Sequence, residues 1–111
     1  MQINRHSDQS ITVLEPVGDM GLYNLGELRS MLLQLRESRQ TKVVIDMVKV
    51  PGIDSITIGF LLQETNLFSE AGGALKIARI SASVRKSLNI TETLSQMSVY
   101  DDVEAAKAAF R

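Results

Sequence analysis

The sequence feature that most constrains the fold is a continuous run of three β-branched residues, Val43-Val44-Ile45. A strand with one face in water alternates apolar and polar residues, whereas this run offers apolar side chains to both sides. Polar residues bound it, so we expect a short strand over residues 42–47 that is buried on both faces. Such strands occur in parallel sheets covered by helices, and the run therefore predicts an α/β fold.

Amphipathic helices are predicted on either side of this strand. The first covers residues 22–36, because leucines at spacings of three and four share one face: Leu25, Leu28, Leu32 and Leu35. Asn24 is its expected N-cap, with Glu27 three residues later as in a capping box. The second begins at Asp54 and Ser55 and ends near Glu70, with an expected core stripe of Ile58, Leu61, Leu62, Thr65 and Phe68. Ala71-Gly72-Gly73 ends it, since glycine supplies the left-handed residue found at helix ends.

The remaining segments continue the alternation of strands and helices. Strand patterns at residues 2–5 and 10–16, joined by a polar link at residues 6–9, predict a hairpin. After the second helix we expect a strand at 75–78, a helix from Ser81 or Ser83 to Leu88, and a strand at 97–100. Asp101 or Asp102 caps the last predicted helix, which carries Val103, Ala106 and Phe110 on one face. This order indicates one domain over residues 1–111: a mixed, mainly parallel sheet with an antiparallel edge pair and about four flanking helices.

Composition and charge exclude several classes of function. The chain has 111 residues, no cysteine and a net charge of -1. Disulfides and thiolate chemistry are therefore excluded, and no overall field draws the chain onto nucleic acid or an anionic membrane. No apolar run approaches the roughly 20 residues that a membrane helix needs, so we expect no direct membrane insertion.

A catalytic site is also hard to assemble from these residues. The one histidine, His6, falls in the predicted link, and no glycine-rich loop of a nucleotide-binding type is present. The densest acidic group, Asp101, Asp102 and Glu104, is better explained as charge that complements a helix N-terminus than as a metal site. We therefore expect no catalytic residue, no metal and no cofactor, and predict that the chain is not an enzyme.

One segment carries a candidate site: Asp54-Ser55 opens a helix directly after the buried strand. First-turn amides of a helix are unsatisfied and partly positive, so they stabilise an anion there, including a phosphate on Ser55 or Thr57. The simpler explanation is that Asp54 is only the N-cap. Ile56 and Phe60 lie off the core stripe, one turn apart; they form an exposed patch beside this site, or a neighbouring loop covers them.

At this segment the chain resembles the anti-sigma factor antagonists of the STAS domain family. The resemblance covers nearly the whole chain and rests on several motifs in order: Gly18-Asp19-Met20, Glu27-Leu28, Val44-Ile45-Asp46, Asp54-Ser55 with Gly59, Ala71-Gly72-Gly73-Ala74-Leu75, and Val99-Tyr100-Asp101-Asp102 before Glu104-Ala105-Ala106. It implies a STAS-like fold and a cytoplasmic regulator that binds an anti-sigma factor or serine kinase of the kinase/ATPase fold, so that a sigma factor is released. In this family the kinase ends the interaction by phosphorylating the start of the second helix, and a phosphatase resets it.

This chain differs from the family pattern at the position that is usually phosphorylated. The typical pattern is Asp-Ser-Ser-Gly-x-Gly with phosphate on the second serine, and here that position is Ile56, followed by Thr57. In stressosome-type relatives the acceptor directly follows the aspartate, which is Ser55 here, so the resemblance implies Ser55 as first and Thr57 as second phosphoacceptor. Of two acids common in the loop after the second strand, Asp19 matches the first and Gly21 replaces the second. The partner-binding residues that the resemblance implies are Asp19, Met20, Gly52, Asp54, Ser55, Ile56, Thr57, Gly59 and Phe60.

Two other non-enzymatic functions stay open. Without the usual phosphoacceptor, the chain is also compatible with a constitutive scaffold subunit in a signalling assembly. STAS domains also occur with membrane transporters, so an accessory subunit of a transporter is the third possibility.

Overall fold

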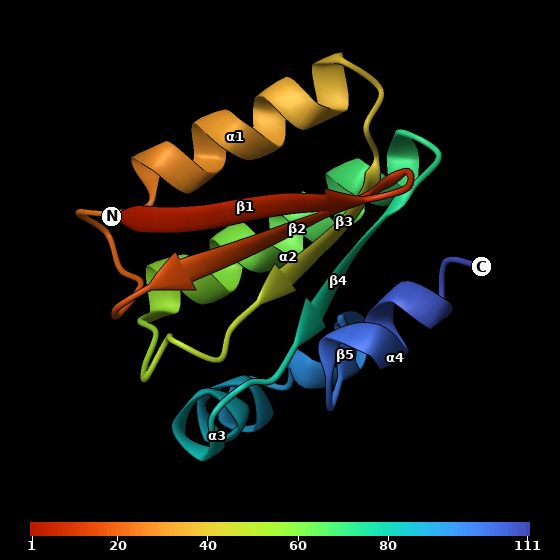
Figure 1. Ribbon diagram of the computed structural model, residues 1–111. Coiled ribbons are helices and arrows are strands. Elements are labelled where there is room, and N and C mark those ends of the chain that lie inside the picture. Colours follow the sequence, from red (N-terminus) through yellow and green to blue (C-terminus); the bar gives the residue numbers. More distant parts are fainter.

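A computed structural model describes all residues 1–111, and its centre is one five-stranded sheet (Figure 1). The strands are β1 (Gln2–Asp8), β2 (Ile11–Val17), β3 (Lys42–Asp46), β4 (Ala74–Ala78) and β5 (Ser98–Tyr100), and they lie side by side in that order. β1 and β2 pair antiparallel, whereas every later neighbour pairs parallel. The predicted α/β class, with a mainly parallel sheet and an antiparallel edge pair, is confirmed.

Helices cover both faces of this sheet. They are α1 (Gly26–Glu37), α2 (Ser55–Glu70), α3 (Ala82–Ile90) and α4 (Val103–Ala108), with a short 3₁₀ turn, η1 (Leu94–Gln96), before β5. In Figure 1 α2 passes behind the sheet and α4 crosses in front of it. The number and order of the predicted helices are confirmed, and the 3₁₀ turn is an addition.

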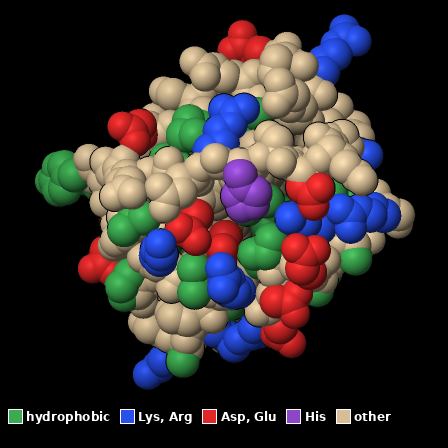
Figure 2. Space-filling model, viewed as in Figure 1, with side chains coloured by type: hydrophobic (Ala, Val, Ile, Leu, Met, Phe, Trp, Pro, Cys, Tyr) green, Lys and Arg blue, Asp and Glu red, His purple; other side chains and the backbone are tan.

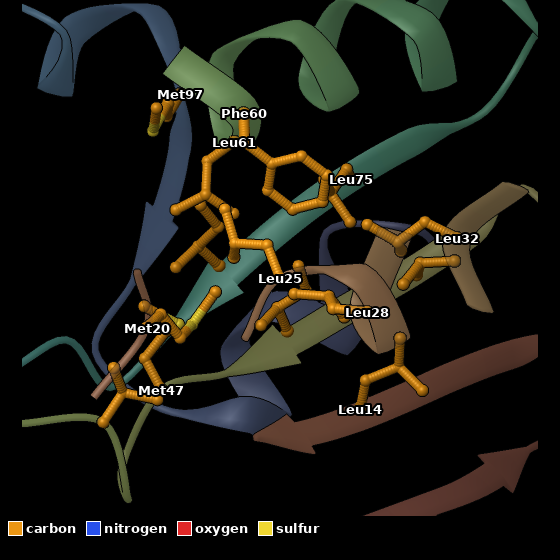
Figure 3. Close-up of a cluster of buried hydrophobic side chains, with 14 of the residues drawn as sticks. Leu14, Met20, Leu25, Leu28, Leu32, Met47, Phe60, Leu61, Leu75 and Met97 are labelled. Carbon is orange, nitrogen blue, oxygen red and sulfur yellow. The ribbon is translucent and has the colours of Figure 1, made fainter. Parts of the chain in front are cut away.

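The hydrophobic core lies on both sides of β3. Val43 and Ile45 point into the larger cluster, which joins the sheet to α1, α2 and α3, whereas Val44 points into a smaller cluster beneath α4. All three side chains are fully buried, as their continuous apolar run predicts. Figure 3 shows the larger cluster around Met20, Met47 and Phe60, three side chains from separate segments. The loops that carry the candidate site are therefore held by core side chains, not only by their backbone.

The predicted hairpin link at residues 6–9 is wrong. β1 continues through His6, which pairs with Val13, and the turn is Gln9-Ser10 instead. In Figure 2 this histidine stands on the face toward α4, among side chains of both charges. Residues 6–8 are polar although they belong to a strand, because β1 lies at the edge of the sheet and most of its side chains meet water.

The expected start of α1 is also wrong. The helix begins at Gly26 and has no side-chain cap, because Asn24 closes a local turn instead. Its side-chain oxygen accepts from the Gly21 N–H at 2.8 Å, and its amide donates to the Asp19 carbonyl at 2.6 Å. Asparagine competes in this way for nearby backbone groups, so a cap-like sequence can specify a turn. The cap expected at Asp54 is confirmed. Of the alternatives for the last two helices, Ser81 rather than Ser83 caps α3, and Asp102 rather than Asp101 caps α4.

Close backbone packing fixes the connection between α2 and β4. Gly72 has a positive φ of 87° and ends the helix as expected, and Gly73 follows with no room for a side chain. A Cβ on Gly73 would lie 2.0 Å from the Thr41 carbonyl oxygen, which also accepts the Ala74 N–H at 2.9 Å. The first pairing of β3 with β4 therefore depends on this glycine.

Substituting alanine at Gly73 tests this packing. We expect Gly73→Ala to lower the free energy of unfolding by about 3 kcal/mol, because backbone atoms must move apart. Gly59→Ala is the matched control: this glycine lies in an exposed part of α2 with nothing near its missing Cβ, so the change should add roughly 0.5–1 kcal/mol. Urea unfolding followed by circular dichroism measures both, and equal midpoints for Gly73→Ala and wild type would contradict the contact.

Candidate functional site

The candidate site lies at the carboxyl ends of β2 and β3, where two loops meet. Residues 18–25 follow β2 and residues 47–54 follow β3, and both strands run parallel. The loops form an isolated bridge between Met20 and Ile53, with the Met20 N–H donating to the Gly52 carbonyl at 3.2 Å. Ligand sites in open α/β sheets form at this edge, since loops from adjacent parallel strands converge there.

The Asp54 carboxylate joins these loops to the start of α2. One oxygen accepts from the Thr57 N–H at 2.9 Å, and the other accepts from the Leu22 N–H at 3.0 Å. These bonds stabilise the charged form, so they lower the pKa of Asp54, with the Thr57 backbone bond as the largest cause, followed by the Thr57 hydroxyl. Asp54 is therefore the predicted N-cap and also a link between segments 32 residues apart.

Gly21 is shaped to this carboxylate. A Cβ there would lie 2.9 Å from Asp54 Oδ2, which is closer than a carbon and an oxygen normally approach. The sequence shows Gly21 only as a missing acid, whereas the structure gives a physical reason for a residue without a side chain. A carboxylate at this position would add both crowding and repulsion.

Ser55 and Thr57, the two predicted phosphoacceptors, lie in opposite environments. Ser55 is the first residue of α2 and is exposed to solvent. Thr57 is 0% exposed, and its hydroxyl lies 2.9 Å from the Met20 carbonyl and 2.8 Å from an Asp54 oxygen. A kinase can reach Thr57 only if these loops open, so the geometry favours Ser55 and counts against Thr57.

Of the two alternatives for Ile56 and Phe60, an exposed patch or cover by a neighbouring loop, neither holds for both residues. Ile56 is 48% exposed, but Phe60 is only 4% exposed and packs in the main core beneath α1 (Figure 3). The Arg29 guanidinium lies over its ring, 5.4 Å from the centroid. The apolar stripe of α2 is wider than predicted, because α1 covers one flank while the sheet covers the other. Met20 is likewise buried, so both side chains belong to the core in this structure.

An open pocket of about 600 Å³ lies beside Asp54, and we call it the Asp54 pocket. Its walls come from both loops and the first turn of α2, with side chains of Asp19, Leu22, Tyr23, Ile53, Asp54 and Ile56. Tyr23 is 98% exposed, and Leu22 beside it is also exposed. Leu22 and Tyr23 fall within the helix predicted over residues 22–36, so the sequence does not place them at this site. One signal in the sequence indicates their exposure: Gly21 and Asn24 are residues that favour turns, and the two large apolar residues lie between them.

The charge of the Asp54 pocket is negative. Asp19 and Asp54 contribute carboxylates, and no lysine or arginine is among the residues that line it. Exposed apolar side chains around two acids form a surface that complements a basic residue flanked by apolar ones. No three His, Asp or Glu side chains in the structure are grouped closely enough to hold a metal ion. No helix combines the length and the apolar character required to cross a membrane.

Comparison with known families and curated proteins gives one match. A family model described as the STAS domain matches residues 2–106, which is nearly the whole chain. No curated protein sequence matches.

Solved structures share the fold at low sequence identity. A candidate anti-sigma factor antagonist from Thermotoga maritima has a TM-score of 0.91 at 17% identity, covering 98% of this chain and 94% of that one. The anti-sigma factor antagonist SpoIIAA in its unphosphorylated form has a TM-score of 0.74 at 13% identity, covering 97% and 96%, and the Bacillus protein is also solved phosphorylated. The murine anion transporter Slc26a9 has a TM-score of 0.75 at 15% identity, over 90% of this chain but only 17% of the transporter.

Removing the Thr57 hydroxyl tests whether it holds the loops together. We expect Thr57→Val to lower the free energy of unfolding by about 2 kcal/mol, because the buried Met20 carbonyl and the Asp54 carboxylate lose a donor. Thr65→Val is the matched control on α2, since the Thr65 hydroxyl only bonds the Leu61 carbonyl within the same helix. Urea unfolding compares the two, and an unchanged midpoint for Thr57→Val would show that the bond contributes nothing.

The lowered pKa of Asp54 predicts a pH dependence. Folding stabilises the charged carboxylate, so its contribution is full above the ordinary value of 3.8 and is lost as pH falls through the lower folded pKa. We expect Asp54→Asn to be less stable than wild type at pH 7, with the difference shrinking toward pH 3. Unfolding midpoints at pH 3, 5 and 7 measure this, with exposed Asp101→Asn as control. A wild-type advantage that stays constant with pH would contradict the assignment.

Proposed function

The chain belongs to the STAS domain family, and from that premise we propose that it is an anti-sigma factor antagonist-like regulator. In this proposal it is a non-catalytic protein of the cytoplasm that binds an anti-sigma factor or serine kinase of the kinase/ATPase fold. Binding occupies the partner, so that a sigma factor is released for transcription. The single observation that carries the proposal is the Asp54 pocket, which is lined by several of the residues that the family resemblance implies for partner binding.

The chemistry of the pocket supports protein docking rather than a small-ligand site. Tyr23, Leu22 and Ile56 are exposed together around a concave surface, and aromatic anchors of this kind concentrate binding energy at protein interfaces. The two carboxylates in the pocket have no basic neighbour in its lining. The complementary partner surface therefore presents a lysine or arginine with apolar side chains beside it.

Ser55 supplies the proposed switch at the rim of this pocket. Its phosphate would carry about -1.5 to -2 charges beside Asp54, in a region without a cation. A partner that approaches with a basic and apolar surface would have to desolvate this dianion, which weakens docking. The exposed position of Ser55 on the first turn of α2 keeps the phosphate near free helix amides, so the modified chain stays folded.

This mechanism is a partner switch without catalysis by the chain itself. The kinase-fold partner transfers phosphate to Ser55 and dissociates, and a phosphatase restores the unmodified serine. SpoIIAA, which is solved in unphosphorylated and phosphorylated forms, supports the idea that a fold of this kind accommodates the modification. Thr57 is too enclosed to serve in the same way while the loops are closed.

The second candidate function is a scaffold or accessory subunit. The similarity of this chain to one part of the anion transporter Slc26a9 supports an accessory role in a transporter. Ile56 at the usual phosphoserine position supports a constitutive scaffold. Two measurements separate these roles from the first. A scaffold predicts a large particle in size exclusion with light scattering, and an accessory subunit predicts that membrane protein co-purifies with the tagged chain.

The experiment that tests the proposed switch is partner capture followed by binding measurements. Tagged protein is recovered from its native cells, a retained kinase-fold protein is identified by mass spectrometry, and its affinity is measured by calorimetry. We expect Ser55→Ala to bind like wild type and Ser55→Asp to bind at least about tenfold more weakly, because the added charge lies at the contact.

The matched control is Ser83→Asp, which adds the same charge near the exposed start of α3 and should not change binding. If Ser55→Ala and Ser55→Asp both bind like wild type, Ser55 is not the switch. Capture of transporter subunits alone, or of other STAS proteins alone, would contradict the sigma-factor role.

A further inference from the structure

A second pocket lies at the opposite end of the sheet from Asp54, and we call it the hairpin pocket. It has a volume of about 240 Å³ and lies between the turn of the β1–β2 hairpin and the loop that joins α1 to β3. Its walls carry the hydroxyls of Ser7, Ser10, Thr12 and Thr41 and the cationic side chains of Arg39 and Lys42, with no apolar residue. In Figure 1 the red hairpin turn and the yellow loop that leads from α1 to β3 lie side by side.

Thr12 is the buried polar group of this pocket. The residue is 2% exposed, and its hydroxyl takes part in no side-chain hydrogen bond within the chain. Every fully enclosed side-chain oxygen or nitrogen in the structure has a partner, so the Thr12 hydroxyl is not fully enclosed, and Thr12 is one of the residues that line the pocket. A group bound in the pocket can therefore hydrogen-bond this hydroxyl in place of water.

The two cations of the pocket are unpaired. Ion pairs in the structure involve Arg36, Lys49, Arg79, Lys107 and Arg111, but neither Arg39 nor Lys42. No acidic residue lines the pocket, and the nearby Asp8 is already paired with Lys107 and Arg111. Two positive charges beside hydroxyl donors therefore make a positive concave surface, which attracts an anion.

Both loops of the pocket also hold a side chain where glycine would fit the backbone better. Gln9 in the hairpin turn has a φ of 58°, and Arg39 after α1 has a φ of 62°. Residues with a Cβ adopt this region at a cost of about 1–2 kcal/mol. Both side chains line the pocket, so the strained positions are those that bring polar groups to it.

We propose that the hairpin pocket binds a phosphate group. Its volume lies below the roughly 300–1,000 Å³ of pockets for drug-sized ligands, which limits the enclosed part to a small group. A tetrahedral oxyanion matches the available chemistry: the Arg39 guanidinium donates two parallel bonds, Lys42 adds charge, and the hydroxyls of Ser10 and Thr12 donate to the remaining oxygens. The phosphate is either free or the end of a small phosphomonoester that extends into solvent. The pocket is independent of the proposed partner switch because it lies at the other end of the sheet.

The test is an NMR titration of the full chain at constant ionic strength, with inorganic phosphate and glycerol 3-phosphate as probes and chloride as the comparison anion. We expect saturable shifts at the amides of residues 9–12 and 39–42, with dissociation constants in the millimolar range or below. Tighter binding of glycerol 3-phosphate identifies the ligand as a phosphomonoester, and equal affinities identify the phosphate group alone.

Three variants separate binding from folding. Arg39→Gln should weaken phosphate binding at least about fivefold, and Thr12→Val should weaken it about threefold while the spectrum stays that of a folded chain. Arg85→Gln, an exposed cation on α3, is the matched control and should bind like wild type. The proposal is overturned if chloride causes the same shifts, if no saturation occurs by about 20 mM, or if Arg39→Gln binds phosphate unchanged.

Discussion

The hydrogen bonds of the Asp54 carboxylate are the interaction on which the site depends. This group accepts from Thr57 on α2 and from Leu22 on the loop after β2, so it fixes the helix start against that loop. The Thr57 hydroxyl extends the link to the Met20 carbonyl, and Gly21 leaves space for the carboxylate. The Met20 and Met47 side chains lie in the core, so core packing holds both loops that build the pocket (Figure 3).

This arrangement separates the residues that build the pocket from those that can act on a partner. Asp54, Thr57 and Met20 are engaged within the chain, whereas Ser55, Tyr23 and Ile56 face outward. A charge added at Ser55 therefore changes the docking surface without breaking the bonds that shape it. The hairpin pocket lies at the other end of the strands, and its two cations, Arg39 and Lys42, form no ion pair within the chain.

Much of the fold could be predicted from local patterns. The Val43–Ile45 run predicted a strand buried on both faces, and the caps at Asp54 and Asp102 predicted two helix starts, because these signals act over a few residues. The burial of Phe60 depends on how α1 crosses α2, which no local pattern contains. Asn24 has the sequence context of a helix cap, but the same side chain can satisfy a turn, as it does here. Leu22 and Tyr23 therefore lie in a loop that lines the pocket and not in the predicted helix.

The most direct test of the account is hydrogen–deuterium exchange of the chain, alone and in complex with its recovered kinase-fold partner. The account places the contact at the Asp54 pocket, so amides in residues 19–24 and 52–60 should exchange more slowly in the complex. Residues 38–42, at the hairpin pocket, should exchange at the same rate in both states. Protection confined to α4 or to β1, with no change at residues 19–24 and 52–60, would contradict the central claim.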